Sequence, residues 1–149
     1  MATIRLPQDF RDFLRLLDAH EVRYLLVGGY AVGYHGYPRA TADMDIWVSR
    51  TEDNARKLVD VLEEFGFADA ASAARAFTEA EQVIRMGVPP LRIEIITSAS
   101  GVDFDACYAQ RIDGDLDGVR VNILSLPDLR KNKRAAGRLK DLADLEELP

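Results

Sequence analysis

Two aspartates separated by one residue form the part of the sequence best suited to metal chemistry. The segment reads Asp43-Met44-Asp45. In a β-strand, side chains at positions i and i+2 point to the same face, about 7 Å apart. Two such carboxylates repel each other, and a hard divalent cation relieves the repulsion because it prefers oxygen ligands. An Asp-x-Asp pair alone is more typical of a solvated strand face, so the metal interpretation needs support from other residues.

A third acid lies inside an apolar stretch later in the chain. In Leu91–Thr97, the residues Ile93 and Ile95 alternate with Glu94, which shares its face with Arg92. A strand here would bury the isoleucines and turn Glu94 the other way. If this strand pairs beside Asp43–Asp45, Glu94 completes a three-carboxylate site. The alternative is a glutamate that reaches water or pairs with an arginine.

A double glycine precedes the aspartates. Gly28-Gly29 follows the apolar run Tyr24–Val27 and precedes a short helix expected over Tyr30–His35. Glycine allows a close approach of the backbone to a ligand, and free N–H groups at a helix start attract phosphate. Glycines alone would equally indicate a tight turn that needs positive φ.

Together these residues resemble a known signature. Gly28-Gly29, thirteen further residues and then Asp43-Met44-Asp45 resemble the motif of the nucleotidyltransferase superfamily related to DNA polymerase β. The longer pattern, with His35-Gly36 and Arg39, is most similar to the branch of abortive-infection-type nucleotidyltransferase toxins and small uncharacterised bacterial relatives. Two departures are Gly29, where serine is frequent in the superfamily, and Glu94, where aspartate is more frequent.

The resemblance implies a site and a reaction. Asp43, Asp45 and Glu94 would be catalytic and would ligate Mg²⁺ or Mn²⁺, while Gly28 and Gly29 would contact a nucleoside triphosphate. The reaction would move a nucleoside monophosphate to an acceptor hydroxyl and release pyrophosphate. The acceptor stays open between a protein, a tRNA and a small molecule. The alternative function is a nucleotide-binding component of a toxin–antitoxin pair, or a regulatory module with little or no turnover.

Basic residues near the motif could hold phosphate. Arg39 lies in the expected loop before Asp43, where a guanidinium could clamp phosphate through two hydrogen bonds; a surface arginine is the alternative. In the last expected helix, Lys133 and Lys140 fall on an otherwise apolar face, which indicates contact with the triphosphate. The alternative is that their stems pack while the ammonium groups reach water.

Two further side chains have simpler interpretations. Trp47 falls on the carboxylate side of the Asp45 strand, where packing beside the site is favoured over stacking on a base. Cys107 is the single cysteine, which excludes an internal disulfide and a cysteine metal cluster. We interpret it as an ordinary helix thiol.

The periodicity of the apolar residues predicts a single α+β domain over residues 1–149. Its sheet should be mixed, largely antiparallel and of about five strands, with helices covering one side, which is a nucleotidyltransferase-like arrangement. Strands are expected over Tyr24–Val27, Met44–Val48, Gln82–Met86, Leu91–Thr97 and Val119–Leu124, with a turn over Gly87–Pro90. Helices are expected over Pro7–His20, Tyr30–His35, the segment that ends at Phe65, Ala70–Ala80, Phe104–Ala109 and a last helix from Pro127 to about Leu148.

Composition limits the partners and the compartment. The net charge is −6 over 149 residues, which argues against a duplex nucleic acid as partner. No apolar run is long enough to span a bilayer, and the first residues lack the apolar block of a signal peptide, so we expect a cytoplasmic protein without membrane contact. The small size favours a small partner protein or a homo-oligomer.

Overall fold

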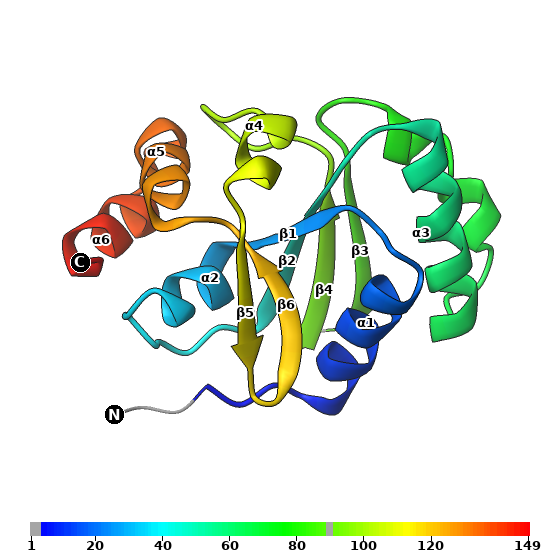
Figure 1. Ribbon diagram of the computed structural model, residues 1–149, viewed down its shortest axis with the longest axis horizontal. Helices are drawn as coiled ribbons and strands as arrows, with labels where there is room; N and C mark the ends of the chain where they lie inside the picture. The colour runs from blue at the N-terminus through cyan, green and yellow to red at the C-terminus, as the bar shows by residue number, and fades with distance from the viewer. Residues whose placement is uncertain (1–3, 89–90) are drawn as a thin grey trace.

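The computed structural model describes residues 4–88 and 91–149, and six strands of it form one sheet (Figure 1). The strand order is β3-β4-β2-β1-β6-β5. Residues 89 and 90 of the expected Gly87–Pro90 turn lie outside the described residues. The strands are β1 (Tyr24–Val27), β2 (Asp43–Val48), β3 (Val83–Val88), β4 (Leu91–Ile96), β5 (Ile112–Leu116) and β6 (Val119–Ile123).

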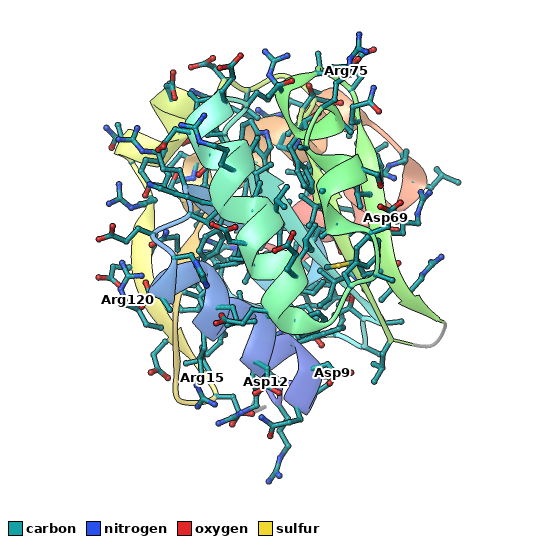
Figure 2. The ribbon with its side chains drawn as sticks, turned by 90° about the vertical axis from the view of Figure 1, so that its right-hand side faces the viewer. Asp9, Asp12, Arg15, Asp69, Arg75 and Arg120 are labelled. Atoms are coloured by element: carbon teal, nitrogen blue, oxygen red, sulfur yellow. The ribbon has the colours of Figure 1, made fainter. Side chains whose placement is uncertain are left out.

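Helices lie on both sides of this sheet, so the expectation that they cover one side only is wrong. One face is covered by α1 and α3, whereas α2, α5 and α6 lie on the other side (Figures 1 and 2). Charged side chains such as Asp9, Asp12 and Arg15 project outward from α1 in Figure 2. The helices are α1 (Gln8–Ala19), α2 (Gly28–Tyr34), α3 (Glu52–Phe65), α4 (Phe104–Ala109), α5 (Leu126–Ala136) and α6 (Leu139–Glu147), with 3₁₀ turns η1 (Ala70–Ala73) and η2 (Ala76–Thr78).

The sheet is mixed, as the sequence predicts. Strand β2 lies between β1, to which it is antiparallel, and β4, to which it is parallel. Strand β1 is parallel to β6, while β3–β4 and β5–β6 are antiparallel pairs. A parallel pair needs a crossover connection, and the chain between β2 and β4 supplies it with α3, the two 3₁₀ turns and β3.

The alternation along β2 and β4 separates the core from the opposite face. Met44, Ile46 and Val48 have no exposed surface, and Ile93 and Ile95 are buried as well. The chain thereby anchors both strands through their apolar residues and leaves the intervening acids on the other face. None of the helices in the described residues is long and apolar enough to cross a membrane.

The sheet has one strand more than expected. The segment around Asp113-Gly114-Asp115 reads as a turn but forms β5, which pairs with β6 along its length. As an edge strand it has one neighbour only, and acidic residues suit the solvated face of such a strand. The segment Ala70–Ala80 is likewise not a continuous helix, because only the two 3₁₀ turns form there.

The expectation of one long last helix is wrong, because the helix divides at Gly137. This residue has φ +65°, in the left-handed region, and it caps α5 after Ala136. Glycine adopts this conformation without the steric cost that a Cβ imposes, so it commonly ends helices. The second helix, α6, begins at Leu139 with a change of direction, and it packs against α5.

Candidate active site

The parallel pairing of β2 with β4 brings the predicted acids together. The register places Asp45 directly beside Glu94 and Asp43 directly beside Arg92. The sequence left this adjacency as an assumption, and the structure has the two strands as neighbours. All three carboxylates line the same cavity, of about 860 Å³.

Two of the three acids hold arginines. The Arg92 guanidinium lies 3.2 Å from the Asp43 carboxylate, and Arg85 on β3 donates to Glu94 Oε1 at 2.9 Å. Both acids therefore have a counter-ion from the protein. Within residues 4–88 and 91–149, no group of three His, Cys, Asp or Glu side chains is assembled as a metal cluster.

The surroundings of Asp45 disfavour its ionised form. Burial, the negative charge of Glu94 and a hydrogen bond with Glu94 raise the pKa of Asp45 to about 7. The charge of Asp43 contributes to this raised pKa, while the charge of Lys140 opposes it. A proton or a cation between two carboxylates placed in this way reduces their repulsion.

The double glycine packs directly against the acidic strand. Gly28 has φ +67°, and a Cβ at this position would collide with the Asp45 carboxylate. A Cβ at Gly29 would lie 2.7 Å from Thr41 Oγ1. Helix α2 begins at Gly28 rather than at Tyr30, so the glycines form its first turn and not a separate loop. The backbone can approach the carboxylates this closely only because both side chains are absent.

Basic side chains form the wall opposite the acids. Arg39, Lys133, Arg138 and Lys140 all line the large cavity. Lys140 is exposed, and its charge acts on Asp45. The cavity thus has an acidic floor on β2 and β4 and a basic wall, an arrangement that suits a phosphate chain with its cation.

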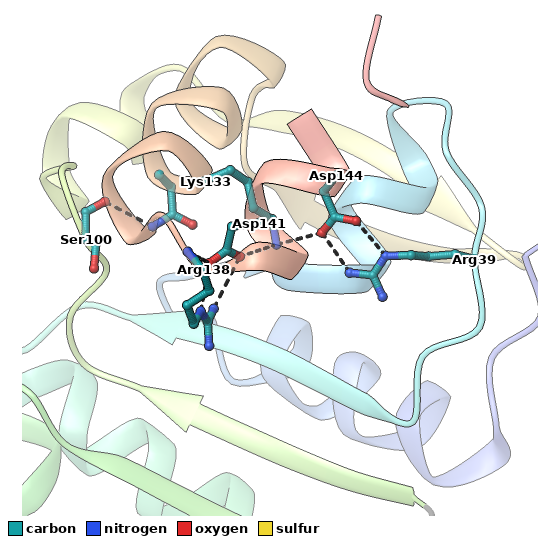
Figure 3. Close-up of polar contacts among 7 residues, drawn as sticks. Arg39, Ser100, Lys133, Arg138, Asp141 and Asp144 are labelled. Carbon is teal, nitrogen blue, oxygen red and sulfur yellow. Dashed lines mark hydrogen bonds and ion pairs between the residues drawn. The ribbon is translucent and has the colours of Figure 1, made fainter. Parts of the chain in front are cut away.

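Three of the four basic residues are held by two buried aspartates (Figure 3). Asp144 accepts two hydrogen bonds from the Arg39 guanidinium, both at 2.9 Å, and lies 3.0 Å from Lys133 Nζ. Asp141 contacts the same Lys133 at 3.2 Å and Arg138 at 2.7 Å. The two aspartates are almost completely buried. They fix the positions of cationic groups that come from separate segments.

The acids of this network stay ionised despite their burial. Burial alone would raise the pKa of Asp141, but hydrogen bonds from Arg138 and Lys133 outweigh it and leave the pKa lowered. The pKa of Asp144 is lowered for the same reason, by Arg39 and Lys133. The alternative interpretation of Lys133 was that its stem packs while its ammonium group reaches water. The residue is buried, so this interpretation is wrong for Lys133.

Sequence reasoning missed several of these residues. Arg138 is absent from the expected site, because the face shared by Lys133 and Lys140 was predicted for one unbroken helix. Gly137 was the signal that could have corrected it, since glycine followed by a new polar segment is typical of a helix end. The role of Asp141 and Asp144 had no such signal, because only the folded chain brings Arg39 to them. Cys107 is buried, and burial with the neighbouring Asp128 raises its pKa to about 12, as suits an unreactive helix thiol.

Comparison with known proteins assigns the family. A model of the aminoglycoside-2''-adenylyltransferase family matches residues 9–148. The chain belongs to this family. The aminoglycoside-2''-adenylyltransferase assignment confirms the prediction of the nucleotidyltransferase superfamily, although the motifs were most similar to its abortive-infection branch.

The fold of this aminoglycoside-2''-adenylyltransferase family member is also found in a solved structure. A crystal structure of a candidate nucleotidyltransferase from Thermotoga maritima superposes with a TM-score of 0.61 at 15% identity. The match covers 92% of this chain and 88% of that chain, and it supports the predicted fold. No curated protein matches the sequence.

Proposed function

We propose that this chain is a single-domain, metal-dependent nucleotidyltransferase that moves a nucleoside monophosphate from a nucleoside triphosphate to an acceptor hydroxyl. The observation that carries the proposal is the pairing of Asp45 with Glu94 beneath Gly28, on the floor of a cavity with a basic wall. Family membership supports the transfer of a nucleotide. The geometry supports these acids as its centre.

The donor set fits Mg²⁺ or Mn²⁺. Asp45, Glu94 and Asp43 are not assembled as a cluster within the described residues, and their carboxylate oxygens would hold the ion once it draws them together. The raised pKa of Asp45 reflects a repulsion that a cation relieves. Magnesium in nucleotide sites commonly binds one or two carboxylates and takes its remaining ligands from phosphate and water. This agrees with a site in which arginines hold Asp43 and Glu94. A bound ion would neutralise the charge that develops on the departing pyrophosphate.

Residues of the chain would bind and orient the triphosphate. The backbone at Gly28 and Gly29 would lie against the triphosphate, and Arg39, Lys133 and Lys140 would orient its outer phosphates. Electrostatic groups that are fixed in advance stabilise developing charge without reorganising. The aspartates that hold Arg39 and Lys133 supply this fixity. Glu94 would take the proton of the attacking hydroxyl.

The family name directs the choice of acceptor. Aminoglycosides offer several hydroxyl groups, so we propose a small molecule of this kind ahead of a protein or a tRNA. The experiment is transfer of label from α-³²P-ATP to kanamycin with Mg²⁺, with a protein extract and bulk tRNA as parallel acceptors. Asp45→Asn should abolish transfer to any of them, while Asp60→Asn, on exposed α3 surface, should leave it unchanged. No nucleotide binding and no labelled product would overturn the proposal.

A second function is favoured by the two ion pairs in the floor. Arg92 and Arg85 neutralise Asp43 and Glu94, as expected of a nucleotide-binding module or toxin–antitoxin component with little or no turnover. Calorimetry with ATP would then show binding, whereas no acceptor would become labelled. Co-purification with a small partner protein would point the same way.

A further inference from the structure

The last helix, α6, buries acids and exposes leucines. Its inner side carries Asp141 and Asp144, which are buried and hold the basic wall of the large cavity. On its outer side, Leu139 is 88% exposed and Leu142 is 45% exposed. A surface helix normally buries its apolar stripe and exposes its charges. The aspartates have partners inside the fold, whereas nothing within the chain explains the outward leucines.

These leucines belong to one continuous face. At 100° per residue, Leu139, Leu142 and Ala143 fall within about 100° of one another around the axis of α6, and all three are exposed. We call these three residues the leucine face. The helix lies at the edge of the molecule and packs mainly against α5, so this face is open (Figure 1).

The leucine face differs from the other exposed apolar side chains. Among the described residues, the remaining large hydrophobic side chains that are exposed are Val83 and Leu91, which lie at opposite ends of the β3–β4 pair. Single exposed apolar residues are normal on a protein surface. Two leucines and an alanine that adjoin on one helix indicate a contact with another molecule.

We propose that a second copy of this chain covers the leucine face, with the two α6 helices packed antiparallel about a two-fold axis. The same face of each subunit then contacts the other, so the assembly closes as a dimer. This dimer does not depend on the transferase function, because it concerns the outer side of α6 and not the acids on β2 and β4.

The charges beside the leucine face select this partner and this orientation. Lys140 lies at the start of α6 and Glu147 at its end, and both are exposed. Residues seven apart lie on the same side of a helix. In an antiparallel pair, Lys140 therefore lies beside Glu147 of the partner subunit, and this contact occurs twice. A parallel pair would bring like charges together, which opposes association.

The size of the leucine face determines the strength of the dimer. Helix α6 has nine residues, which gives it a length of about 13 Å. A stable interface buries about 800 Å² on each partner, which is more than one short helix provides. We therefore expect a reversible dimer with a dissociation constant of about 10–100 μM.

Sedimentation equilibrium of the full chain measures this dimer. The protein should be free of nucleotide, because Lys140 also lines the large cavity. Between about 1 μM and about 500 μM, the average mass should rise from that of one chain toward that of two. The buffer should contain physiological salt, so that weak charge attraction between other surfaces is screened.

One substitution in the leucine face should abolish the dimer. Leu139→Glu places a charge in the centre of the proposed contact and should leave the chain monomeric. The side chain is 88% exposed and lies in the first turn of α6, where an acid is favourable, so the urea midpoint should not fall. Leu91→Glu adds the same charge at an exposed leucine of β4 and is the matched control, with the wild-type dimer retained.

Charge reversal tests the orientation. Lys140→Glu and Glu147→Lys should each weaken dimerisation about tenfold, because both ion pairs of the two-fold contact become repulsive. The chain that carries both substitutions should dimerise like the wild type, since the two ion pairs form again with their partners exchanged. A parallel pair would be insensitive to either single change.

The measured masses decide between the outcomes. A chain that stays monomeric at about 500 μM overturns the proposal. A dimer that persists in Leu139→Glu, or that Leu91→Glu disrupts, would place the interface elsewhere and overturn it as well. If either single charge reversal leaves dimerisation unchanged, the antiparallel contact is wrong. Nucleotide binding enters none of these measurements, so calorimetry with ATP tests the transferase function separately.

Discussion

Gly28 and Asp45 are in such close contact that position 28 has no room for a side chain. A Cβ there would meet both Oδ2 and Cγ of the aspartate. The pair joins the first turn of α2 to the centre of β2, two elements separated by a loop. The backbone and the carboxylate therefore define one surface, to which the triphosphate and its cation are proposed to bind.

Gly28→Ala should abolish nucleotide binding. The methyl group would displace the Asp45 carboxylate, and the positive φ adds a backbone cost of about 1 kcal/mol. Gly118→Ala is the matched control, because Gly118 has φ +80° and open space around it. In urea, Gly118→Ala should lose only the backbone cost, whereas Gly28→Ala should lose more stability because of the added collision, and only Gly28→Ala should lose the calorimetric signal of Mg²⁺ and ATP. Equal nucleotide affinity in the two variants would contradict the role of this contact.

Asp45→Asn should inactivate the protein and stabilise its nucleotide-free form. In the unfolded chain Asp45 ionises near its ordinary pKa of about 4, whereas the folded protein raises this pKa to about 7. Stability from the protonated form is therefore lost as pH rises from 4 to 7. The amide of the variant does not titrate. The gain in its free energy of unfolding over the wild type should therefore be absent at pH 4 and reach about 1–3 kcal/mol at pH 8.

Denaturant titrations of both proteins across this pH range would measure the gain. Asp60→Asn, on the exposed surface of α3, should show no such pH-dependent difference. A gain that is constant with pH would mean that the charge of Asp45 is not its cause.

Asp144→Asn should destabilise the fold by about 2–4 kcal/mol. The change removes a charged partner from Lys133, which is 4% exposed, and breaks the two-fold contact with Arg39. A buried charge that loses its partner is costly, although Asp141 remains beside Lys133. Asp53→Asn, in an exposed ion pair with Arg56 and Lys57, is the control and should leave the urea midpoint unchanged. An equal midpoint shift in both would show that burial is unimportant here.

Arg85→Gln should strengthen metal binding in the absence of nucleotide. Arg85 competes with a cation for Glu94, so its loss should increase the affinity for Mn²⁺ severalfold. Electron paramagnetic resonance would count free Mn²⁺ during a titration. Arg56→Gln removes the same charge from α3 and should leave the affinity unchanged. Weaker Mn²⁺ binding in Arg85→Gln would instead show that the arginine orients Glu94 for the metal.

The local sequence pattern was sufficient to predict which residues of β2 and β4 form the acidic floor. The alternation in Asp43–Val48 and Leu91–Ile96 predicted which residues enter the core, and burial confirms it. It also placed Arg92 on the face of Glu94, although not its pairing with Asp43. The pairing depends on the relative shift of two strands, and a shift of one residue would turn every acid to the other side.

Other features depend on contacts between distant segments. The face predicted for Lys133 and Lys140 assumed one helix through Gly137, and the break at this residue changes the direction of every side chain after it. Arg39 meets Asp144 only when the loop before β2 folds against α6. The edge strand β5 was missed because Asp113-Gly114-Asp115 has the composition of a turn, and its extended form depends on pairing with β6.

The wide separation of the site residues along the chain has a thermodynamic consequence. The glycine turn, the two acidic strands and the cations around Arg138 come from four separate stretches, so a denatured molecule retains no affinity for a nucleotide. A ligand that binds only the native state stabilises it by the full amount RT ln(1 + [L]/Kd). Melting temperature as a function of nucleotide concentration should therefore yield the dissociation constant directly, without knowledge of any acceptor.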